Sequence, residues 1–591
     1  MGVTAQSTLE SALGNPSAKA ILGAFLPGIV NSPMARQLGW MPLGSLLAMS
    51  PAVRDDAALL ADLWNRLAAL GDDENGVREA RGWSEAEPRA VSPGYEPDSV
   101  PLASAAARHP DRVGRFGRVE IVIDGPSHGN PFVDVELTAV VIVDGLRQQV
   151  GGFYDGDGRY RIRFLASQAG EWTFTTSSNA RSLDGLGGRI ECVPEPVARG
   201  PVGVADTFHF AHADGTRYLP IGTTAYAWTH QTDALQRQTL DTLAGSPFNK
   251  LRMCVFPKAY LFNANEPELY PFEGTPAGGW DLDRFDPRFF RKLEDRIDRL
   301  AVLGIEADLI LFHAYDRWGF STLPAAIDDR YVAYLVRRLS AYTNVWWSLA
   351  NEYDLLPGKA VADWERLAGV VVANDPVGHL LSIHNCFGFY DYSRPWITHC
   401  SVQRIDVYRT SENTDAWRGE WRKPIVIDEC AYEGDIDQGW GNITGQEMVR
   451  RFWEGAVRGG YVGHGETYLN DREELWWSKG GELTGSSPDR IGFLRQVIET
   501  APGGVLDPLP SDWDVPWAGV AGEYYLLYLG FGQPRYRTIV LPAGRRYAVD
   551  VIDTWAMTVD RLPGEFEGYF SVPLPGRQFM AIRLSVVPAG E

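Results

Sequence analysis

The spacing of hydrophobic residues changes along the chain, and each spacing predicts a different kind of element. Over residues 1–72 apolar positions recur every three or four residues, most clearly in "RDDAALLADLWNRLAALG", which is typical of amphipathic helices. Residues 73–112 are polar and contain Pro and Gly, as expected of a linker. Over residues 113–200 apolar and polar positions alternate, with "DGDG" as a turn signal, so we predict a small antiparallel β-sandwich. In "FVDVELTAVVIVDG" the alternation, and hence the expected strand, begins near Val133.

Between residues 205 and 505 apolar runs alternate with helical stretches such as "PRFFRKLEDRIDRLAVLG" and "DRYVAYLVRRLSAY". The runs are nearly continuous, as in parallel strands that are covered on both faces. Eight runs over about 250 residues match the size of a (β/α)8 TIM barrel. The predicted strands are 218–228, 248–256, 304–316, 344–354, 380–386, 398–403, 424–434 and 461–468. Residues 515–591 return to short strands and turns, which predicts a second, C-terminal β-sandwich.

Composition limits the partners and the compartment. The net charge of −21 argues against nucleic acid or an anionic membrane as a partner, since both attract a basic surface. No run of about 18 apolar residues predicts a membrane span. The five cysteines are widely spaced and form no C-x-x-C motif, so we expect free, mostly buried thiols. Because "MGVTAQSTLESALGNP" also lacks a basic n-region and an apolar h-region, we expect a cytoplasmic protein.

Two carboxylates follow predicted barrel strands. The fourth run, "NVWWSLANEYD", leads into Asn351 and Glu352, and the seventh, "PIVIDECAYEG", contains Asp428 and Glu429. Active sites of such barrels lie at the carboxyl ends of the strands, so we expect both glutamates at one mouth. Two carboxyl groups that face one sugar can cleave a glycosidic bond, because one protonates the leaving oxygen while the other attacks the anomeric carbon or activates water. The acid needs a raised pKa, which a neighbouring carboxylate and low polarity would supply.

The strand ends "LANE" and "VIDE" resemble those of clan A glycoside hydrolases, the superfamily that contains glycoside hydrolase family 5. The resemblance implies that Glu352 is the acid/base, that Glu429 is the nucleophile, that Asn351 binds the sugar 2-hydroxyl, and that configuration is retained. The flanking segments are similar to the small sandwiches before and after the barrel of certain glycosidases, the first of which is known only as a domain of unknown function. The resemblance covers about residues 115–590 and does not include the N-terminal helices.

Other residues near the predicted strand ends suit a hydroxyl-rich ligand, because each buried sugar hydroxyl needs a hydrogen-bond partner. Arg252 resembles the clan's arginine that orients the nucleophile. Many relatives have a His or Tyr near the nucleophile where this chain has Gln403, so Tyr408 is an alternative partner of Glu429. The polar candidates are His313, Asp316, His384, Asn385, Gln403, His464 and Glu466. The aromatic candidates for stacking on sugar are Tyr226, Trp228, Trp318, Tyr432, Trp476 and Trp477, of which the last two lie in a loop-like stretch, "REELWWSKGG". A structural role is the alternative for each.

These features predict a retaining exo-glycosidase that hydrolyses small glycosides or oligosaccharides, either β-D-glycosides or α-L-arabinofuranosides, by double displacement. The alternatives are a transglycosidase or an endo-acting polysaccharide hydrolase with the same residues, and a non-catalytic carbohydrate-binding protein. His209 and His212 have H-x-x-H spacing but no acidic or Cys residue nearby that completes a ligand set, so we expect neither a metal nor a cofactor. The N-terminal helices have two open roles, self-association into a homo-oligomer and capping of the barrel.

Overall fold

The computed structural model describes residues 3–30, 35, 38–50, 53, 56–70, 91, 94–260, 262–404, 409–510 and 512–588. Residues 73–90, 92 and 93 of the predicted linker 73–112 therefore lie outside the described residues. The chain forms two compact units that are each assembled from distant segments. The first comprises Met1–Pro201, Cys254–Arg299 and Leu309–His379, and the second comprises Val202–Met253, Leu300–Asp308 and Leu380–Glu591.

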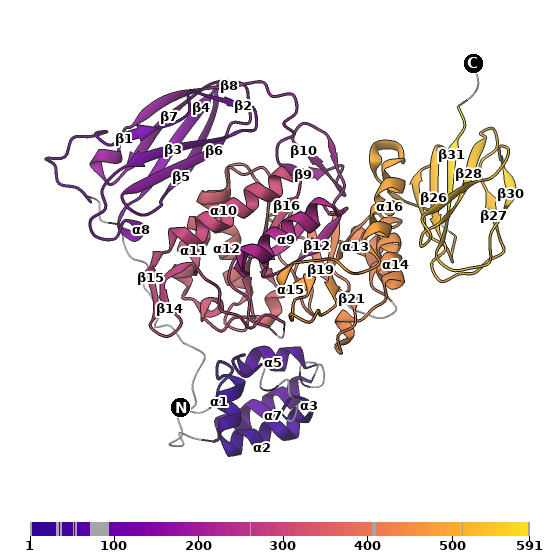
Figure 1. The fold of residues 1–591 in the computed structure, drawn as a ribbon, viewed down its shortest axis with the longest axis horizontal. Coiled ribbons are helices and arrows are strands. Elements are labelled where there is room, and N and C mark those ends of the chain that lie inside the picture. The colour runs from indigo at the N-terminus through magenta and orange to yellow at the C-terminus, as the bar shows by residue number, and fades with distance from the viewer. Residues whose placement is uncertain are drawn as a thin grey trace. The chain divides into compact units, whose positions relative to one another are not determined.

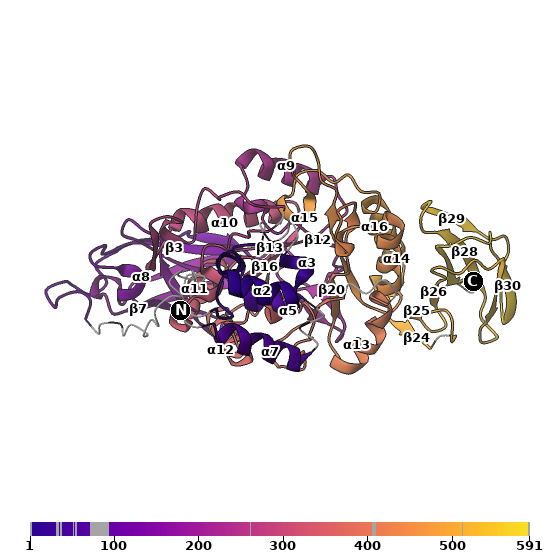
Figure 2. The same cartoon turned by 90° about the horizontal axis from the view of Figure 1, so that it is seen from below.

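Helices form the described part of the N-terminal segment (Figure 2), as the hydrophobic spacing predicts. They are α1 (Leu9–Gly14), α2 (Pro16–Phe25), α3 (Pro27–Val30), α5 (Leu43–Met49) and α7 (Ala57–Ala68). Side chains start two of them, because Asn15 accepts hydrogen bonds from the first turn of α2 and Asp56 accepts one from Leu59 N in α7. Leu63 and Leu67, one turn apart on α7, are fully buried, so this face packs inward.

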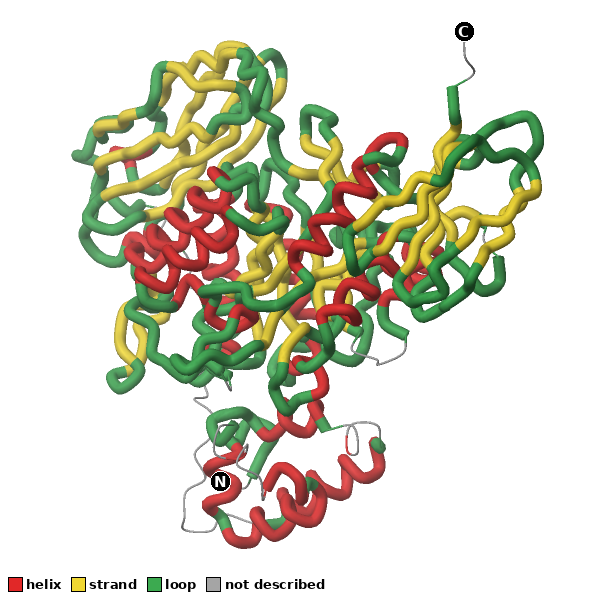
Figure 3. Tube along the Cα trace, turned by 45° about the vertical axis from the view of Figure 1, so that its right-hand side comes forward, coloured by secondary structure: helices red, strands yellow, loops and turns green. Residues whose placement is uncertain are grey.

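Strands and loops make up the segment that follows (Figure 3). An eight-stranded sheet has the order β1-β3-β6-β5-β4-β7-β8-β2, and all its pairs except β2–β8 are antiparallel. The strands are β1 (Ala106–Arg108), β2 (Arg112–Gly114), β3 (Arg118–Asp124), β4 (Leu137–Val143), β5 (Leu146–Tyr154), β6 (Arg159–Leu165), β7 (Gly170–Ser178) and β8 (Gly187–Val193). In β3, Val119, Ile121 and Ile123 are buried while their neighbours are not, which confirms the alternating pattern.

The expected strand start at Val133 is wrong. Pro131–Asp134 form a short helix, α8, and β4 begins only at Leu137. Pro131 occupies the first turn, where its missing N–H costs nothing, and Asp134 accepts a hydrogen bond from Asn130 N at 2.8 Å. Alternating apolar and polar residues do not exclude a single helical turn. Four residues are too few to distinguish the period of two in strands from the period of 3.6 in helices.

The eight predicted barrel strands each coincide with a strand of one parallel sheet (Figure 1). These are β12 (Gly222–Thr224), β13 (Lys250–Cys254), β16 (Glu306–His313), β17 (Val345–Asn351), β18 (Leu381–Ser382), β19 (Cys400–Gln403), β20 (Ile425–Glu429) and β22 (Tyr461–His464). The order is β18-β17-β16-β13-β12-β22-β20-β19, so the first strand in sequence pairs with the last. A parallel bridge between His384 and Ser401 joins the chain after β18 to β19. This connectivity is that of a TIM barrel.

Helices lie between most successive strands of this sheet, as in a βα repeat, and two follow the last strand, while none of the described residues 383–399 between β18 and β19 is helical. They are α9 (Asp233–Ala244), α10 (Pro287–Val302), α11 (Ala325–Leu339), α12 (Val361–Asn374), α13 (Thr414–Trp421), α14 (Gly445–Ala456), α15 (Trp476–Lys479) and α16 (Pro488–Glu499). The two helices predicted from quoted stretches are present as α10 and α11. Thr232 and Thr444 cap α9 and α14 by accepting a hydrogen bond from the first turn.

Strands also form the C-terminal segment, with a six-stranded sheet, β24-β25-β26-β31-β28-β29, and the pair β27–β30. They are β24 (Pro508–Leu509), β25 (Trp517–Val520), β26 (Tyr524–Tyr528), β27 (Tyr536–Val540), β28 (Tyr547–Asp553), β29 (Thr558–Arg561), β30 (Tyr569–Pro573) and β31 (Met580–Val586). Their inward residues, such as Leu527, Val549 and Ile582, share one hydrophobic core. No helix among the described residues is long and apolar enough to cross a membrane. All five cysteines are thiols among the described residues, and four of them are buried, as expected.

Candidate active site

Glu352 directly follows β17 and lies in the first unit. Its side chain is only 6 % exposed, and its backbone is left-handed, with φ 55° and ψ 58°. This conformation costs a non-glycine residue about 1–3 kcal/mol and persists only where the surroundings impose it, most often at functional sites. The short 3₁₀ helix η4 (Tyr353–Leu355) begins at this residue, and Leu355 N donates to the Glu352 carbonyl at 2.9 Å.

Two donors hold the Glu352 carboxylate. The hydroxyl of Tyr315 donates a short hydrogen bond to Oε2, and Asn351 Nδ2 donates to the same oxygen at 3.2 Å. Tyr315 is itself fixed, since its ring meets Tyr260 edge to face at 4.8 Å and Lys258 Nζ lies 4.4 Å from its ring centroid. The two hydrogen bonds give the buried Oε2 of Glu352 its partners, which a buried polar atom needs.

Other candidates in the first unit are engaged by the protein. His313 Nε2 lies 3.1 Å from the Phe256 carbonyl. Asp316 accepts backbone hydrogen bonds from Trp318 and Ser321 at 2.8 and 2.6 Å, and burial raises its pKa in spite of these bonds. Trp318 is buried and donates from Nε1 to Glu266 at 2.8 Å. Asp316 therefore shapes the loop after β16, a structural role.

Glu429 is the last residue of β20 and lies in the second unit. It is 6 % exposed, and Tyr226 donates a short hydrogen bond from its hydroxyl to Oε1. His384 Nδ1 lies 3.9 Å from the same oxygen. Burial, followed by the negative charge of Glu429, raises the pKa of Tyr432 well above its ordinary value. Tyrosine hydroxyls that stay protonated can donate to this carboxylate at any physiological pH.

A layer of buried charge adjoins Glu429. Lys250 Nζ lies 2.6 Å from Asp308 and 2.7 Å from Asp428, and Ser401 donates to Asp428 at 2.5 Å. Arg252 Nη1 lies 3.5 Å from Asp308 and 3.7 Å from Asp428. Burial opposes the charge of Arg252, but these carboxylates and, to a lesser extent, Glu429 hold its pKa above the ordinary value. Arg252 thus acts on Glu429 by charge, while its nearest ion pairs are with the layer.

The ends of β18 and β19 are tied together by amide groups. Gln403 N donates to Asn385 Oδ1 at 3.1 Å, and Asn385 Nδ2 donates to the Gln403 carbonyl at 3.3 Å. Gln403 Nε2 also lies 3.8 Å from the sulfur of Cys386. These contacts fix the chain on which His384 approaches Glu429. Tyr408 lies outside the described residues.

The candidates on and after the last strand are structural. His464 stacks on Phe248 at 4.6 Å with Nδ1 2.9 Å from Thr223 Oγ1, and burial lowers its pKa to about 4. Glu466 accepts hydrogen bonds from Thr484 N and Oγ1 at 2.6 and 2.8 Å.

The loop expected at Trp476 and Trp477 is wrong, because both lie in helix α15 and are 1 % and 5 % exposed. Trp476 donates to Thr223 at 2.8 Å, and Trp228 is fully buried with Nε1 3.3 Å from the sulfur of Met253. Large apolar rings favour such burial over exposure.

Two tyrosines of this site were not identified as such from the sequence. Tyr315 was not a candidate, and Tyr226 was expected to stack on sugar, whereas each donates to a carboxylate. The signal was available in "FHAYD" and "GTTAYAW", where a tyrosine follows a predicted strand. The carboxylate that each tyrosine contacts depends on the order of strands in the sheet. Hydrophobic spacing does not encode that order.

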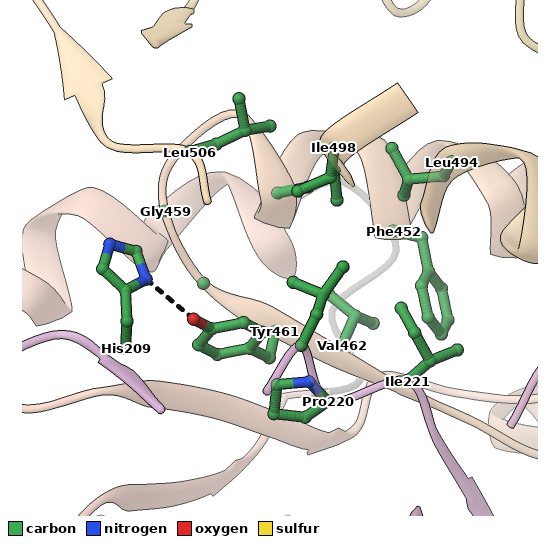
Figure 4. A pocket seen from close by; sticks show the side chains of 13 residues that line it. His209, Pro220, Ile221, Phe452, Gly459, Tyr461, Val462, Leu494, Ile498 and Leu506 are labelled. Atoms are coloured by element: carbon green, nitrogen blue, oxygen red, sulfur yellow. Dashed lines mark hydrogen bonds between the residues drawn. The ribbon is translucent and has the colours of Figure 1, made fainter. Parts of the chain in front are cut away.

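A pocket lies at the opposite ends of the strands, where Ile221 precedes β12 and Tyr461 begins β22 (Figure 4). His209 Nδ1 lies 2.7 Å from the Tyr461 hydroxyl and Nε2 lies 3.1 Å from Asp507, to which Arg418 also donates at 2.6 Å. Its other walls are mostly aliphatic. This end of a TIM barrel serves stability, so we do not include the pocket in the active site. Among the described residues, no group of three His, Cys, Asp or Glu side chains could hold a metal ion.

Three family models match segments of the chain from residue 112 onward. A model described as "Apiosidase-like, catalytic domain" matches residues 205–481, and two domains of unknown function, DUF5060 and DUF5605, match residues 112–179 and 513–585.

Among solved structures, the chain is similar to a "putative glycoside hydrolase" from Bacteroides vulgatus, with 40 % identity and a TM-score of 0.77 over 81 % of this chain and 100 % of that chain. A glycoside hydrolase family 5 protein from the same organism is 15 % identical, with a TM-score of 0.51 over 66 % of this chain and 94 % of that chain. A third structure, named glycoside hydrolase, is 14 % identical, with a TM-score of 0.50 over 67 % and 99 %. The last two show the fold alone. No curated protein matches the chain.

Proposed function

Since this chain belongs to the glycoside hydrolases and has a TIM-barrel-like domain, we propose that it is a retaining exo-glycosidase with Glu352 as acid/base and Glu429 as nucleophile. One observation carries the assignment. Each glutamate stands at the carboxyl end of a strand of the parallel sheet, is nearly buried, and accepts a tyrosine hydroxyl. A barrel's reactive groups lie at these strand ends.

The proposed reaction has two steps. Glu429 attacks the anomeric carbon while Glu352 gives its proton to the leaving oxygen. This step forms a glycosyl-enzyme bond to Glu429 and releases the aglycone. Water then attacks the same carbon, Glu352 takes the proton from it, and the bond to Glu429 breaks. Two inversions at one carbon give net retention. In this scheme Tyr226 holds the Glu429 carboxylate by a hydrogen bond, and Tyr315 and Asn351 orient Glu352.

The matching catalytic-domain model suggests the first substrates to test. It is described as apiosidase-like, so we place apiosyl glycosides first, followed by α-L-arabinofuranosides and β-D-glycosides. Exo action is proposed from the expected cytoplasmic location, where an enzyme meets imported fragments and not polymer. Transglycosylation and endo action by the same residues are the alternatives.

A screen of nitrophenyl glycosides, furanosides included, tests the proposal, with the anomer of the product followed by NMR from the first turnover. We expect hydrolysis of a small glycoside with retention. First-formed product of inverted configuration would overturn the double displacement, and faster cleavage of internal polysaccharide bonds would overturn the exo assignment. Transfer of the sugar to added alcohols at the expense of hydrolysis would identify a transglycosidase.

A further inference from the structure

The N-terminal helices contact the turn that follows Glu352. Helix α5 packs against η4, which begins at Glu352. Ser45 of α5 is 2 % exposed, and its hydroxyl donates to the Leu355 carbonyl at 3.0 Å in a buried contact. The two segments also approach closely at Gly44, where an added Cβ would lie 3.2 Å from the side chain of Pro357. Such a distance is tighter than ordinary van der Waals contact, so only a residue without a side chain fits easily.

Two successive hydrogen bonds connect α5 to the backbone of Glu352. The Ser45 hydroxyl donates to the Leu355 carbonyl, and Leu355 N donates to the Glu352 carbonyl at 2.9 Å. Farther along the loop, Lys359 forms a buried ion pair with Asp328 of α11. The loop is thus fixed on both sides. This matters because the left-handed backbone of Glu352 needs neighbours that hold it in place.

The contact belongs to a segment outside the matched domains. The first of the three family models along the chain begins at residue 112, so none of them includes α5. The apolar side chains of α5 are nevertheless buried, since Leu43, Leu46 and Leu47 are at most 2 % exposed. A helix of seven residues is not stable alone, so its geometry depends on these contacts.

We propose that α5 is a positioning element for the acid/base, and that Ser45 acts through Leu355 to hold the turn on which Glu352 donates its proton. The proposal rests on the proposed function of Glu352. It predicts a specific kinetic signature in kcat/KM, which reports the first step, because a misplaced acid slows that step mainly for leaving groups that need protonation.

The test uses four variants of the full-length chain and a series of glycosides that share one sugar, with leaving groups from nitrophenol to a simple alcohol. We expect Ser45→Arg to lower kcat/KM for the alkyl glycoside by about 10–100-fold and for the nitrophenyl glycoside by less than about 3-fold, since general acid catalysis supplies about 10²–10⁴. Ser45→Ala should show the same pattern at about 3–5-fold, and Ser45→Thr, which keeps the hydroxyl, should match the wild type. Ser17→Arg, at an exposed position of α2, is the matched control.

The outcomes separate positioning from stability. An equal loss of kcat/KM for all leaving groups, or no loss in Ser45→Arg and Ser45→Ala, would overturn the proposal. If Ser45→Arg fails to fold, Ser45→Ala decides alone, because it introduces no bulk. A wild type without glycosidase activity, or a Glu352→Ala variant without dependence on the leaving group, would instead refute the proposed function, and this inference with it.

Discussion

The backbone at Glu429 is that of a strand, whereas the backbone at Glu352 lies outside its strand in a left-handed turn. Glu429 ends β20 in register with Gln403 of β19, and the preceding residue, Asp428, is locked between Lys250 and Ser401. Glu352 depends on contacts from η4, from Tyr315 and, through Leu355, from the N-terminal helices.

This difference fits the two proposed roles. A nucleophile must be fixed in position, and a strand whose neighbouring residue is held by buried ion pairs and hydrogen bonds supplies that condition. An acid/base exchanges a proton in each half of the reaction, so its carboxyl must work in both protonation states. A turn whose backbone is fixed by hydrogen bonds suits that task, because the position of the carboxyl group then does not depend on its protonation state.

Removal of the nucleophile is expected to have the largest effect. Glu429→Ala should lower kcat on the best substrate by at least about 10³-fold, because no covalent intermediate can form. Steady-state assays with the nitrophenyl glycoside measure this. Turnover near the wild-type value would exclude Glu429 as nucleophile.

Removal of the acid/base should have a smaller effect that depends on the substrate. Glu352→Ala should lose about 10²-fold or more on an alkyl glycoside and far less in the first step with nitrophenol, which leaves without a proton. Azide needs no general base, so it should restore turnover of this variant and give a glycosyl azide of retained configuration. An equal loss for all leaving groups, or an azide product of inverted configuration, would contradict the role.

The two tyrosines should separate the carboxylates further. Tyr226→Phe should lower kcat/KM by about 10-fold for every substrate, because a hydrogen bond to a charged group contributes about 1.5–3 kcal/mol. Tyr315→Phe should cost a similar factor, but only with poor leaving groups. Tyr536→Phe, at an exposed ring, is the control and should change nothing. The same dependence of kcat/KM on the leaving group in Tyr226→Phe and Tyr315→Phe would contradict the distinction between the two carboxylates.

The smallest expected effect is a loss of folding stability at acid pH. We expect this loss to arise in the unit that contains Glu429. Burial holds the pKa of His464 at about 4, below its ordinary value of about 6.5. The unfolded chain therefore binds the proton first, and stability that is complete above about pH 6.5 is lost as the pH falls toward 4. His464→Gln should reduce the loss between pH 6.5 and 5.5 by roughly 1 kcal/mol in urea unfolding. His379, which pairs with Asp375 at 3.0 Å, is the control histidine in the first unit. An equal effect of His379→Gln on the acid-induced loss of stability would refute its assignment to the unit that contains Glu429.

The sequence by itself determined the strands, the helices α10 and α11, and the position of Glu352 and Glu429 after apolar runs. These features follow from local periodicity, since a buried parallel strand must be apolar throughout and an amphipathic helix must repeat near 3.6 residues. The class of fold followed from counting such units. The protein's class as a glycoside hydrolase was also within reach, because "LANE" and "VIDE" are contiguous in the chain.

Only the tertiary structure decided which side chains meet. Tyr315 and Glu352 are 37 residues apart, Tyr226 and Glu429 are 203 apart, and Ser45 and Leu355 are 310 apart, and no local repeat relates such pairs. The same applies to Trp476 and Trp477, whose polar neighbours read as a loop although the packing of α15 buries both rings. Hydrophobic spacing reports whether a residue is covered, whereas the partner that covers it depends on the order of the strands and on the segments packed around them.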